Sequence, residues 1–303
     1  MFDFIAYPIG GLLKFIYEFI AFKNYGFAII ILTIFVKTVM LPLYIKQYNS
    51  TLRMSEIQPQ LIEIQKKYKN DNEKLNIEMM NLYKKNKISP AGGCLPLFIQ
   101  MPILFSLYYV ISQPLKYMFD KSDVEIKQLY EMIPVGSERI GSMHDLSIIN
   151  YFSSNIDQLP NISLLLGKDE LINMNFLGIN LGLVPTFNYH LMNNEKLYLL
   201  LIPILATVTT YISLKYSTPK SSQKSDNPMQ DSMLKSMNMV SPIMTGFISF
   251  TVPSGLGLYW IVSNIYQVLQ QVFINKFIAK NSSKEKIKCK GEGKEKRLIE
   301  KTT

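Results

Sequence analysis

Long apolar runs without charge alternate along the chain with stretches rich in lysine. An α-helix needs about 20 predominantly apolar residues to cross a bilayer. The pattern therefore predicts an all-α polytopic membrane protein with transmembrane helices at 25–44, 94–111, 197–216, 237–252 and 255–274. A Pro-Ser-Gly turn signal separates the last two spans. The fourth span is short, which indicates local thinning of the bilayer or a protein-lined cavity beside it.

Residues 1–23 show a different pattern, in which apolar residues recur at spacings of three and four. The members of this stripe are Phe2, Ile5, Ile9, Leu12, Ile16 and Phe19. They predict an amphipathic helix that lies in the outer membrane interface. The alternative is a weak additional span, which Lys14 near its middle disfavours.

Residues 47–89 carry two further apolar stripes, on either side of the turn signal Asn70-Asp71-Asn72. The stripes are Leu61, Ile64 and Tyr68, followed by Leu75, Met79 and Leu82. They predict a helical hairpin that projects from the membrane. Two interpretations remain open: the stripes close the hairpin on itself, or part of them meets lipid or an incoming chain.

The distribution of basic residues predicts the orientation of the spans, because lysine and arginine favour cytosolic loops. The segment between the first two spans (45–93), the segment 215–236 before the fourth span and the tail at 275–303 together hold 23 basic and 11 acidic residues. The loop at 112–196 holds six basic and ten acidic residues. We therefore expect the N-terminus and loop 112–196 outside and the C-terminus in the cytosol. The same rule supports dividing 237–274 into two spans.

The tail at 275–303 is basic and nearly free of aromatic residues, which predicts a disordered segment. Its charge would attract polyanions. Anionic membrane lipid and ribosomal RNA are equally compatible with its composition.

Several kinds of chemistry are missing from the sequence. Both histidines, His144 and His190, fall in the outer loop, so the spans offer no zinc site and no Ser–His pair. No complete P-loop motif occurs, and the predicted spans contain no Asp or Glu. An ATPase, an intramembrane protease and an ion-coupled transporter are all disfavoured. We expect no catalytic site, no cofactor and no metal.

Lys37 is the one charge within the first span, and it is the most informative residue of the chain. A charge at the centre of a membrane helix costs about 2.5–3.5 kcal/mol on insertion scales. Lys37 either extends its side chain to the interface or lies in a hydrated cavity. Polar residues in the other spans favour a shared cavity, although hydrogen bonding between helices would also explain them. The candidate groove residues are Lys37, Thr33, Gln100, Ser106, Thr207, Thr210, Trp260 and Asn264.

Four separated segments resemble the YidC/Oxa/Alb family of membrane protein insertases. NYGFAIIILTIFVKTVMLPLYIKQ (24–47) is similar to the first core helix, with Lys37 where most members carry arginine. SPAGGCLPLFIQMPILFSLYY (89–109) is similar to the second, residues 201–212 to the third, and PSGLGLYWIVSNIYQ (253–267) to the last. The form without a large outer domain resembles Gram-positive members.

This resemblance implies an insertase membrane core at 24–274 that surrounds a hydrophilic groove open to the cytosol and to lipid. It implies a multi-pass protein of the bacterial plasma membrane that inserts nascent membrane proteins without ATP. It also implies the Sec translocon, the ribosome and membrane lipids as partners. Lysine keeps the charge of the usual arginine but lacks its bidentate fork. The alternatives are a small-solute transporter or channel, and an assembly scaffold that does not insert.

Overall fold

A computed structural model describes the backbone of residues 3–88, 95–137, 139–186, 194–217 and 228–299. Side chains are described over the same ranges except at 95–99, 161, 194–196, 228–238 and 277–299. The chain is mostly helical. Within the described residues, β-structure is confined to an antiparallel ribbon of β1 (Asn175–Phe176) and β2 (Ile179–Asn180).

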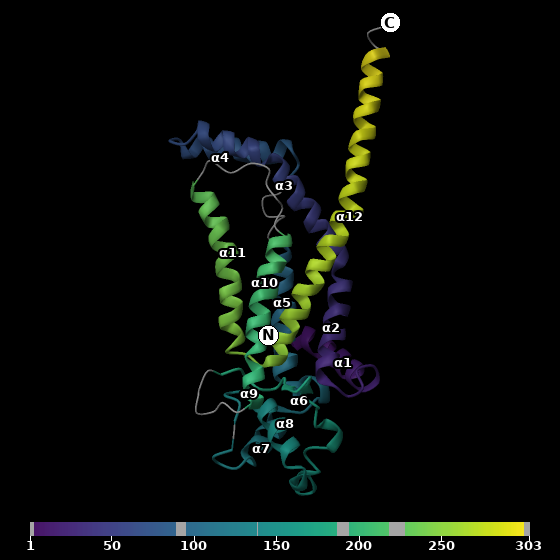
Figure 1. Ribbon diagram of the computed structural model, residues 1–303, viewed down its shortest axis with the longest axis vertical. Coiled ribbons are helices and arrows are strands. Elements are labelled where there is room, and N and C mark those ends of the chain that lie inside the picture. Colours follow the sequence, from purple (N-terminus) through teal and green to yellow (C-terminus); the bar gives the residue numbers. More distant parts are fainter. Residues whose placement is uncertain (1–2, 89–94, 138, 187–193, 218–227, 300–303) are drawn as a thin grey trace.

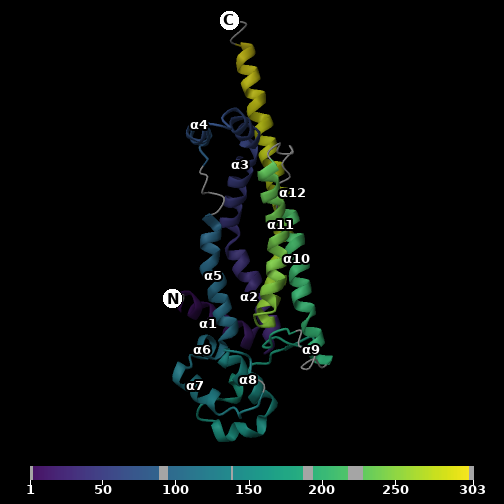
Figure 2. The same cartoon turned by 90° about the vertical axis from the view of Figure 1, so that its left-hand side faces the viewer.

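Long helices that run along the long axis of the molecule form its body (Figures 1 and 2). They are α2 (Tyr25–Val39), α5 (Leu95–Ser112), α10 (Leu201–Ser217), α11 (Pro228–Ser249) and α12 (Ser254–Ile299). Each falls on one of the five predicted spans, and α12 packs against both α10 and α2. A short helix, α9 (Asn194–Leu199), precedes α10.

Length and hydropathy alone single out fewer membrane helices than the sequence pattern does. Among the described residues, Leu197–Ser217 is long and apolar enough to cross a bilayer, and α2 with α3 (Leu41–Lys67) qualifies as a bent pair. Gln100–Ser112 and Met239–Ser249 are shorter apolar helices.

The predicted first span is divided in the structure, because α2 ends at Val39 and α3 departs from its axis by 56°. The cause is Pro42 in the first turn of α3. Proline has no backbone N–H to donate to the carbonyl group of Thr38, and its ring crowds that turn. The bend therefore lies three to five residues after Lys37.

α3 and α4 (Asn72–Lys85) form a hairpin at the end of the molecule where α12 terminates (Figure 1). Asp71 caps α4 by accepting a hydrogen bond from the backbone N–H of Lys74. Leu61 and Leu82, one from each predicted stripe, are buried in a small cluster with Ile57. Ile64 and Met79 pack against this cluster, so these members of the stripes close the hairpin on itself, as in the first interpretation.

The N-terminal helix α1 (Asp3–Phe19) packs against α2, α5 and α6 (Pro114–Phe119). Its buried residues are Ala6, Gly10, Leu13, Ile16 and Tyr17. Of the predicted apolar stripe, Ile16 is buried against the protein, Phe19 is 73% exposed, and Phe2 lies outside the described residues. Phe4 and Phe15 are also exposed, so α1 presents one face to the protein and a second, aromatic face outward.

Residues 112–186, to which the sequence assigned no structure, fold into a packed layer at the end opposite the hairpin (Figures 1 and 2). Its elements are α6, α7 (Asp123–Glu131), α8 (His144–Ser154), η2 (Ile156–Ile162), η3 (Lys168–Glu170) and the β-ribbon. Buried residues such as Leu129 and Phe152 join the same hydrophobic core as Leu32 of α2.

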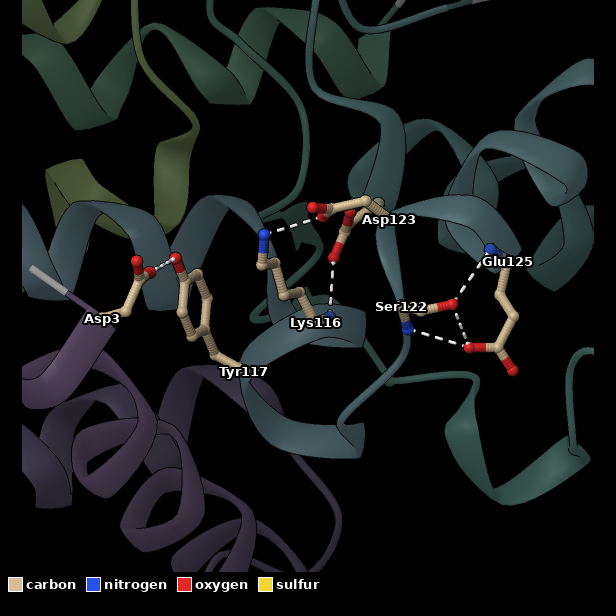
Figure 3. Close-up of polar contacts among 7 residues, drawn as sticks. Asp3, Lys116, Tyr117, Ser122, Asp123 and Glu125 are labelled. Carbon is tan, nitrogen blue, oxygen red and sulfur yellow. Dashed lines mark hydrogen bonds and ion pairs between the residues drawn. The ribbon is translucent and has the colours of Figure 1, made fainter. Parts of the chain in front are cut away.

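Polar contacts fasten this outer layer together (Figure 3). The hydroxyl group of Tyr117 donates a 2.8 Å hydrogen bond to Asp3 and so ties α6 to α1. The ammonium group of Lys116 pairs with Asp123 at 2.7 Å. Ser122 and Glu125 form a capping box at the start of α7.

The prediction of a disordered tail at 275–303 differs from the structure, in which α12 continues without a break to Ile299. The segment contains no proline and is rich in Lys and Glu, which favour helices. The low aromatic content was the reason for predicting disorder, but a helix whose surface is in water does not need aromatic residues.

Candidate substrate groove

A cavity of about 380 Å³ lies at the bend between α2 and α3, and side chains of α5 and α12 complete its walls. Its lining residues are Lys37, Met40, Leu43, Tyr44, Gln47, Gln100, Leu104, Tyr259, Trp260, Ser263, Gln267 and Gln270. A volume of this size is within the range of ligand sites.

The two long walls of the cavity use the same residue spacing. Lys37 begins a series on α2 and α3 that continues at positions 40, 44 and 47. Trp260 begins a series on α12 that continues at positions 263, 267 and 270. Both follow i, i+3, i+7 and i+10, which keeps their members on one helical face. The sequence candidates were chosen by polarity, which missed the other lining residues. The shared spacing could have identified these residues, because it places them on the same helical faces as Lys37 and Trp260.

Lys37 is half-buried, and it is the only charged side chain among the lining residues that the structure describes. No ion pair joins it to another of the described residues. The bend places it beside Gln100 of α5 and Trp260 of α12 in the wall of one cavity. These are three of the eight candidates chosen from the sequence.

The other five candidates lie outside the cavity lining. Thr33 is buried, and its hydroxyl group donates to the carbonyl group of Ile29 at 2.6 Å. Ser106 is also buried. Thr207 donates to the carbonyl group of Pro203 at 2.7 Å and packs closely against Gly246 of α11.

Thr210 and Asn264, the last two candidates, form a contact between α10 and α12. The side-chain amide of Asn264 donates to the hydroxyl oxygen of Thr210 at 2.8 Å and to that of Thr209 at 3.2 Å. Thr210 in turn donates to the carbonyl group of Ala206. Hydrogen bonding between helices, the alternative considered for these residues, describes this contact.

A polar seam joins α3 to α12 beside the cavity. Tyr44 donates to Gln271 at 2.8 Å, and Tyr48 donates to Asn275 at 2.7 Å. Gln271 also donates to Asn275 at 3.0 Å, which links the two pairs. This seam could not be predicted from the sequence, because the partners of Tyr44 and Tyr48 lie 227 residues away along the chain.

Gln270 differs from the other polar lining residues. Its side chain is 8% exposed, and its amide nitrogen Nε2 has no hydrogen-bond partner among the described residues. Gln267, one turn earlier, donates to the hydroxyl group of Ser217 at 3.2 Å. Gln270 therefore carries an unpaired donor among the described residues, and this donor is shielded from solvent.

The outer ends of the helices are held by backbone contacts with the outer layer. Ser254 donates through both its backbone N–H and its hydroxyl group to the carbonyl group of Leu183, each at 2.9 Å. The N–H of Gly255 donates to the carbonyl group of Leu181 at 2.8 Å. The hydroxyl group of Tyr25 reaches the carbonyl group of Ile111 at the end of α5.

Asp145 is buried in the outer layer and caps α6, because its carboxylate accepts a 3.1 Å hydrogen bond from the backbone N–H of Lys116. Burial raises the pKa of Asp145 to about 7, against the opposing effect of the hydrogen bonds. No group of three or more His, Cys, Asp or Glu residues in the described part of the chain is arranged to hold a metal ion.

Comparisons with known proteins agree on one family. The family model for the 60Kd inner membrane protein matches residues 15–282. The chain is 33% identical over 267 residues to a membrane protein insertase YidC of Caldanaerobacter subterraneus subsp. tengcongensis, covering 88% of this chain and 92% of that protein. It is 31% identical over 286 residues to the YidC of Clostridium perfringens, covering 94% and 93% of the two chains.

The YidC of Wigglesworthia glossinidia brevipalpis is 33% identical over 277 residues, which are 91% of this chain but 38% of that longer protein. The chain thus matches short YidC proteins over nearly their whole length. The expected family, and with it a function other than enzyme catalysis, is confirmed. The chain belongs to the YidC/Oxa/Alb family of membrane protein insertases, polytopic proteins of the inner or plasma membrane that act on nascent membrane proteins.

Proposed function

We propose that α2, α5, α10, α11 and α12 cross the bacterial plasma membrane, with the N-terminus outside and the C-terminus in the cytosol. The hairpin and the end of α12 lie at one end of the molecule, and the acid-rich layer 112–186 lies at the other (Figures 1 and 2). This separation of charge agrees with a cytosolic hairpin. The exposed aromatic face of α1 suits a position in the outer interface.

We further propose that the cavity at the bend is the groove that receives an outward-bound polar segment of the substrate. The observation that carries this proposal is that Lys37 is the sole charge among the described residues of the cavity wall and forms no ion pair with any described residue. Lys37 would attract acidic groups of the passing segment. Gln100 and Trp260 would touch the same segment, because they share its cavity.

The remaining candidates, Thr33, Ser106, Thr207, Thr210 and Asn264, would act differently. Thr210 and Asn264 would join α10 to α12, and Thr207 would pack α10 against α11. Thr33 and Ser106 are buried on α2 and α5, and we assign them to the packing of those helices.

No ATP is required in this account. The apolar helix of the substrate gains free energy on reaching lipid, since Leu, Ile, Phe and Val each contribute about 0.3–0.6 kcal/mol at the helix centre. The groove lowers the barrier for the polar segment that must cross first. Water and the charge of Lys37 replace part of the hydration that this segment loses.

Partners beyond the substrate are also part of the proposal. The basic tail, with ten Lys and Arg residues, would contact the ribosome or anionic lipid at the cytosolic surface. The Sec translocon would deliver some substrates from the side.

The test is insertion into liposomes that contain only this protein. Freshly synthesised single-span substrates with an acidic or a neutral outer tail are added, and protection of the tail from protease is measured.

Lys37→Ala should slow insertion of the acidic substrate several-fold, and Lys37→Arg should keep its insertion rate unchanged. Lys46→Ala changes an exposed lysine of α3 and should have no effect on this rate. A transporter would show solute flux without insertion, and a scaffold would bind the substrate without protecting it. Equal rates for Lys37→Ala and the unmodified protein would exclude the proposed role of Lys37.

A further inference from the structure

Glutamine side chains dominate the polar part of the cavity wall. Gln47 comes from α3, Gln100 from α5, and Gln267 and Gln270 from α12. A carboxamide both donates and accepts hydrogen bonds, as a peptide group does. Three helices therefore direct groups of peptide-like chemistry to one cavity.

Gln270 indicates which group of the ligand these side chains would bind. Its side chain is more than nine-tenths buried, and its Nε2 donor is unpaired among the described residues. Buried donors in proteins are nearly always paired, and an exception at a cavity wall calls for an acceptor that is not part of the fold. Nε2 itself is shielded from solvent in the resting protein, so a rotation of the Gln270 carboxamide must turn it toward the cavity before a carbonyl group of the ligand can accept from it.

The conformation of the substrate backbone decides whether its carbonyl groups are free to accept a hydrogen bond from Gln270. A helical segment uses its interior carbonyl and N–H groups for its own hydrogen bonds, whereas an extended segment leaves them free. In a medium poor in water, the free groups of an extended segment need partners from the protein. A carboxamide lining suits an extended segment and offers little to a helix.

We propose that the groove binds the polar segment of its substrate in an extended conformation, through the peptide backbone. Gln270 donates to a backbone carbonyl group, and the other glutamines pair with neighbouring peptide groups. Lys37 adds attraction where the segment carries acids. This inference rests on the proposed function, because it takes the same cavity as the substrate path. It accounts for the entry of uncharged segments, for which Lys37 has no partner.

The conformation can be read from the spacing of crosslinks. Cys94 and Cys289 are replaced by Ala, and a probe cysteine is introduced as Ser263→Cys or, in a second series, Leu104→Cys; both positions line the cavity. A stalled substrate then carries a single cysteine at each of ten successive positions of its outer tail. An extended segment gives disulfide yields that alternate with a period of two. A period of three to four in both series overturns the proposal, as does a uniform yield.

A second measurement addresses Gln270 itself. Two uncharged tails are compared in liposomes, one of Gly and Ser that stays unfolded and one rich in Ala that forms a helix. Gln270→Leu should slow insertion of the Gly/Ser tail about three- to tenfold, the loss expected for one hydrogen bond, and slow the Ala-rich tail less than twofold. Gln128→Leu, an exposed position on α7, is the matched control.

Equal slowing of both tails, or of neither, would overturn the inference. A separate measurement with an acidic tail keeps the two proposals apart. If Lys37→Ala leaves the acidic tail unaffected while Gln270→Leu discriminates the neutral tails, the role of Lys37 fails and the backbone-binding inference stands.

Discussion

The hydroxyl group of Tyr44 donates a 2.8 Å hydrogen bond to the side-chain oxygen of Gln271, across the boundary between α3 and α12. The ring of Tyr44 also lines the cavity that holds Lys37. One side chain thus forms part of the groove wall and fixes the helix after the bend to the long helix opposite.

Tyr44→Phe keeps the ring and removes this hydrogen bond. Loss of one partner from a partly buried network costs about 0.5–1.5 kcal/mol. We expect a lower unfolding free energy for the purified protein in detergent, measured by thermal or denaturant unfolding. Tyr48→Phe should show a similar loss, because its bond to Asn275 belongs to the same network. Tyr68→Phe, at the hairpin tip, is the control, and a loss there equal to that of Tyr44→Phe would contradict this assignment.

Pro42 creates the bend that opens the cavity. Pro42→Ala restores a backbone N–H and lets α2 continue more nearly straight into α3. The distance between spin labels on α4 and on the outer layer should shift, and insertion should slow because the cavity loses its shape. Pro59→Ala, a proline inside α3 away from the cavity, serves as the matched control. An unchanged label distance in Pro42→Ala would show that proline does not set the angle.

Gly10 and Gly11 offer a paired test of how α1 docks. A Cβ atom at Gly10 would overlap the backbone carbonyl group of Tyr117, whereas a Cβ at Gly11 would meet nothing within 4 Å. Gly10→Ala should destabilise the protein by about 1–3 kcal/mol through overpacking. Gly11→Ala should be neutral or stabilise by about 0.5–1 kcal/mol, because Ala favours a helix. Equal unfolding temperatures for the two variants would show that α1 does not pack as described.

Asp145 makes stability depend on pH. Its pKa is about 7 in the folded protein, against 3.8 when exposed. Between these values the folded protein holds a proton that the unfolded chain releases, so stability falls as pH rises, by about 1.4 kcal/mol per unit at most. Above pH 7 the loss is complete.

Asp145→Asn keeps an acceptor for the N–H of Lys116 and cannot ionise. Its unfolding free energy relative to the unmodified protein should therefore rise by about 2 kcal/mol from pH 5 to pH 8. Asp157→Asn, at an exposed position, should show no such trend. A constant difference for Asp145→Asn across this range would mean that the Asp145 carboxyl does not titrate there.

The sequence predicted the helices well because membrane helices are continuous and apolar, a pattern visible without knowledge of neighbours. It identified Lys37 because a charge among apolar residues stands out. It did not identify Tyr44 and Gln270 as residues of the cavity wall, because their roles depend on which helix lies opposite. Pro42 can be seen in the sequence, but the angle of the bend that it causes depends on how the helices pack.

Two residues were assigned to the groove for a related reason. Thr210 and Asn264 are polar residues inside membrane helices, and polarity alone cannot distinguish a cavity wall from a contact between helices. The outer layer was missed because its core comes from separate short segments, such as those that carry Leu129 and Phe152, with no long periodic run.

The central claim is that Lys37 acts on the substrate by charge attraction, and an exchange of charges tests it most directly. Lys37→Glu and the unmodified protein are each given substrates with an acidic or a lysine-bearing outer tail, in liposomes without a membrane potential. We predict that the unmodified protein inserts the acidic tail faster and that Lys37→Glu reverses the order. A coupling of about 1 kcal/mol or more across the four rates would support direct contact. The same preference in both proteins would contradict the account.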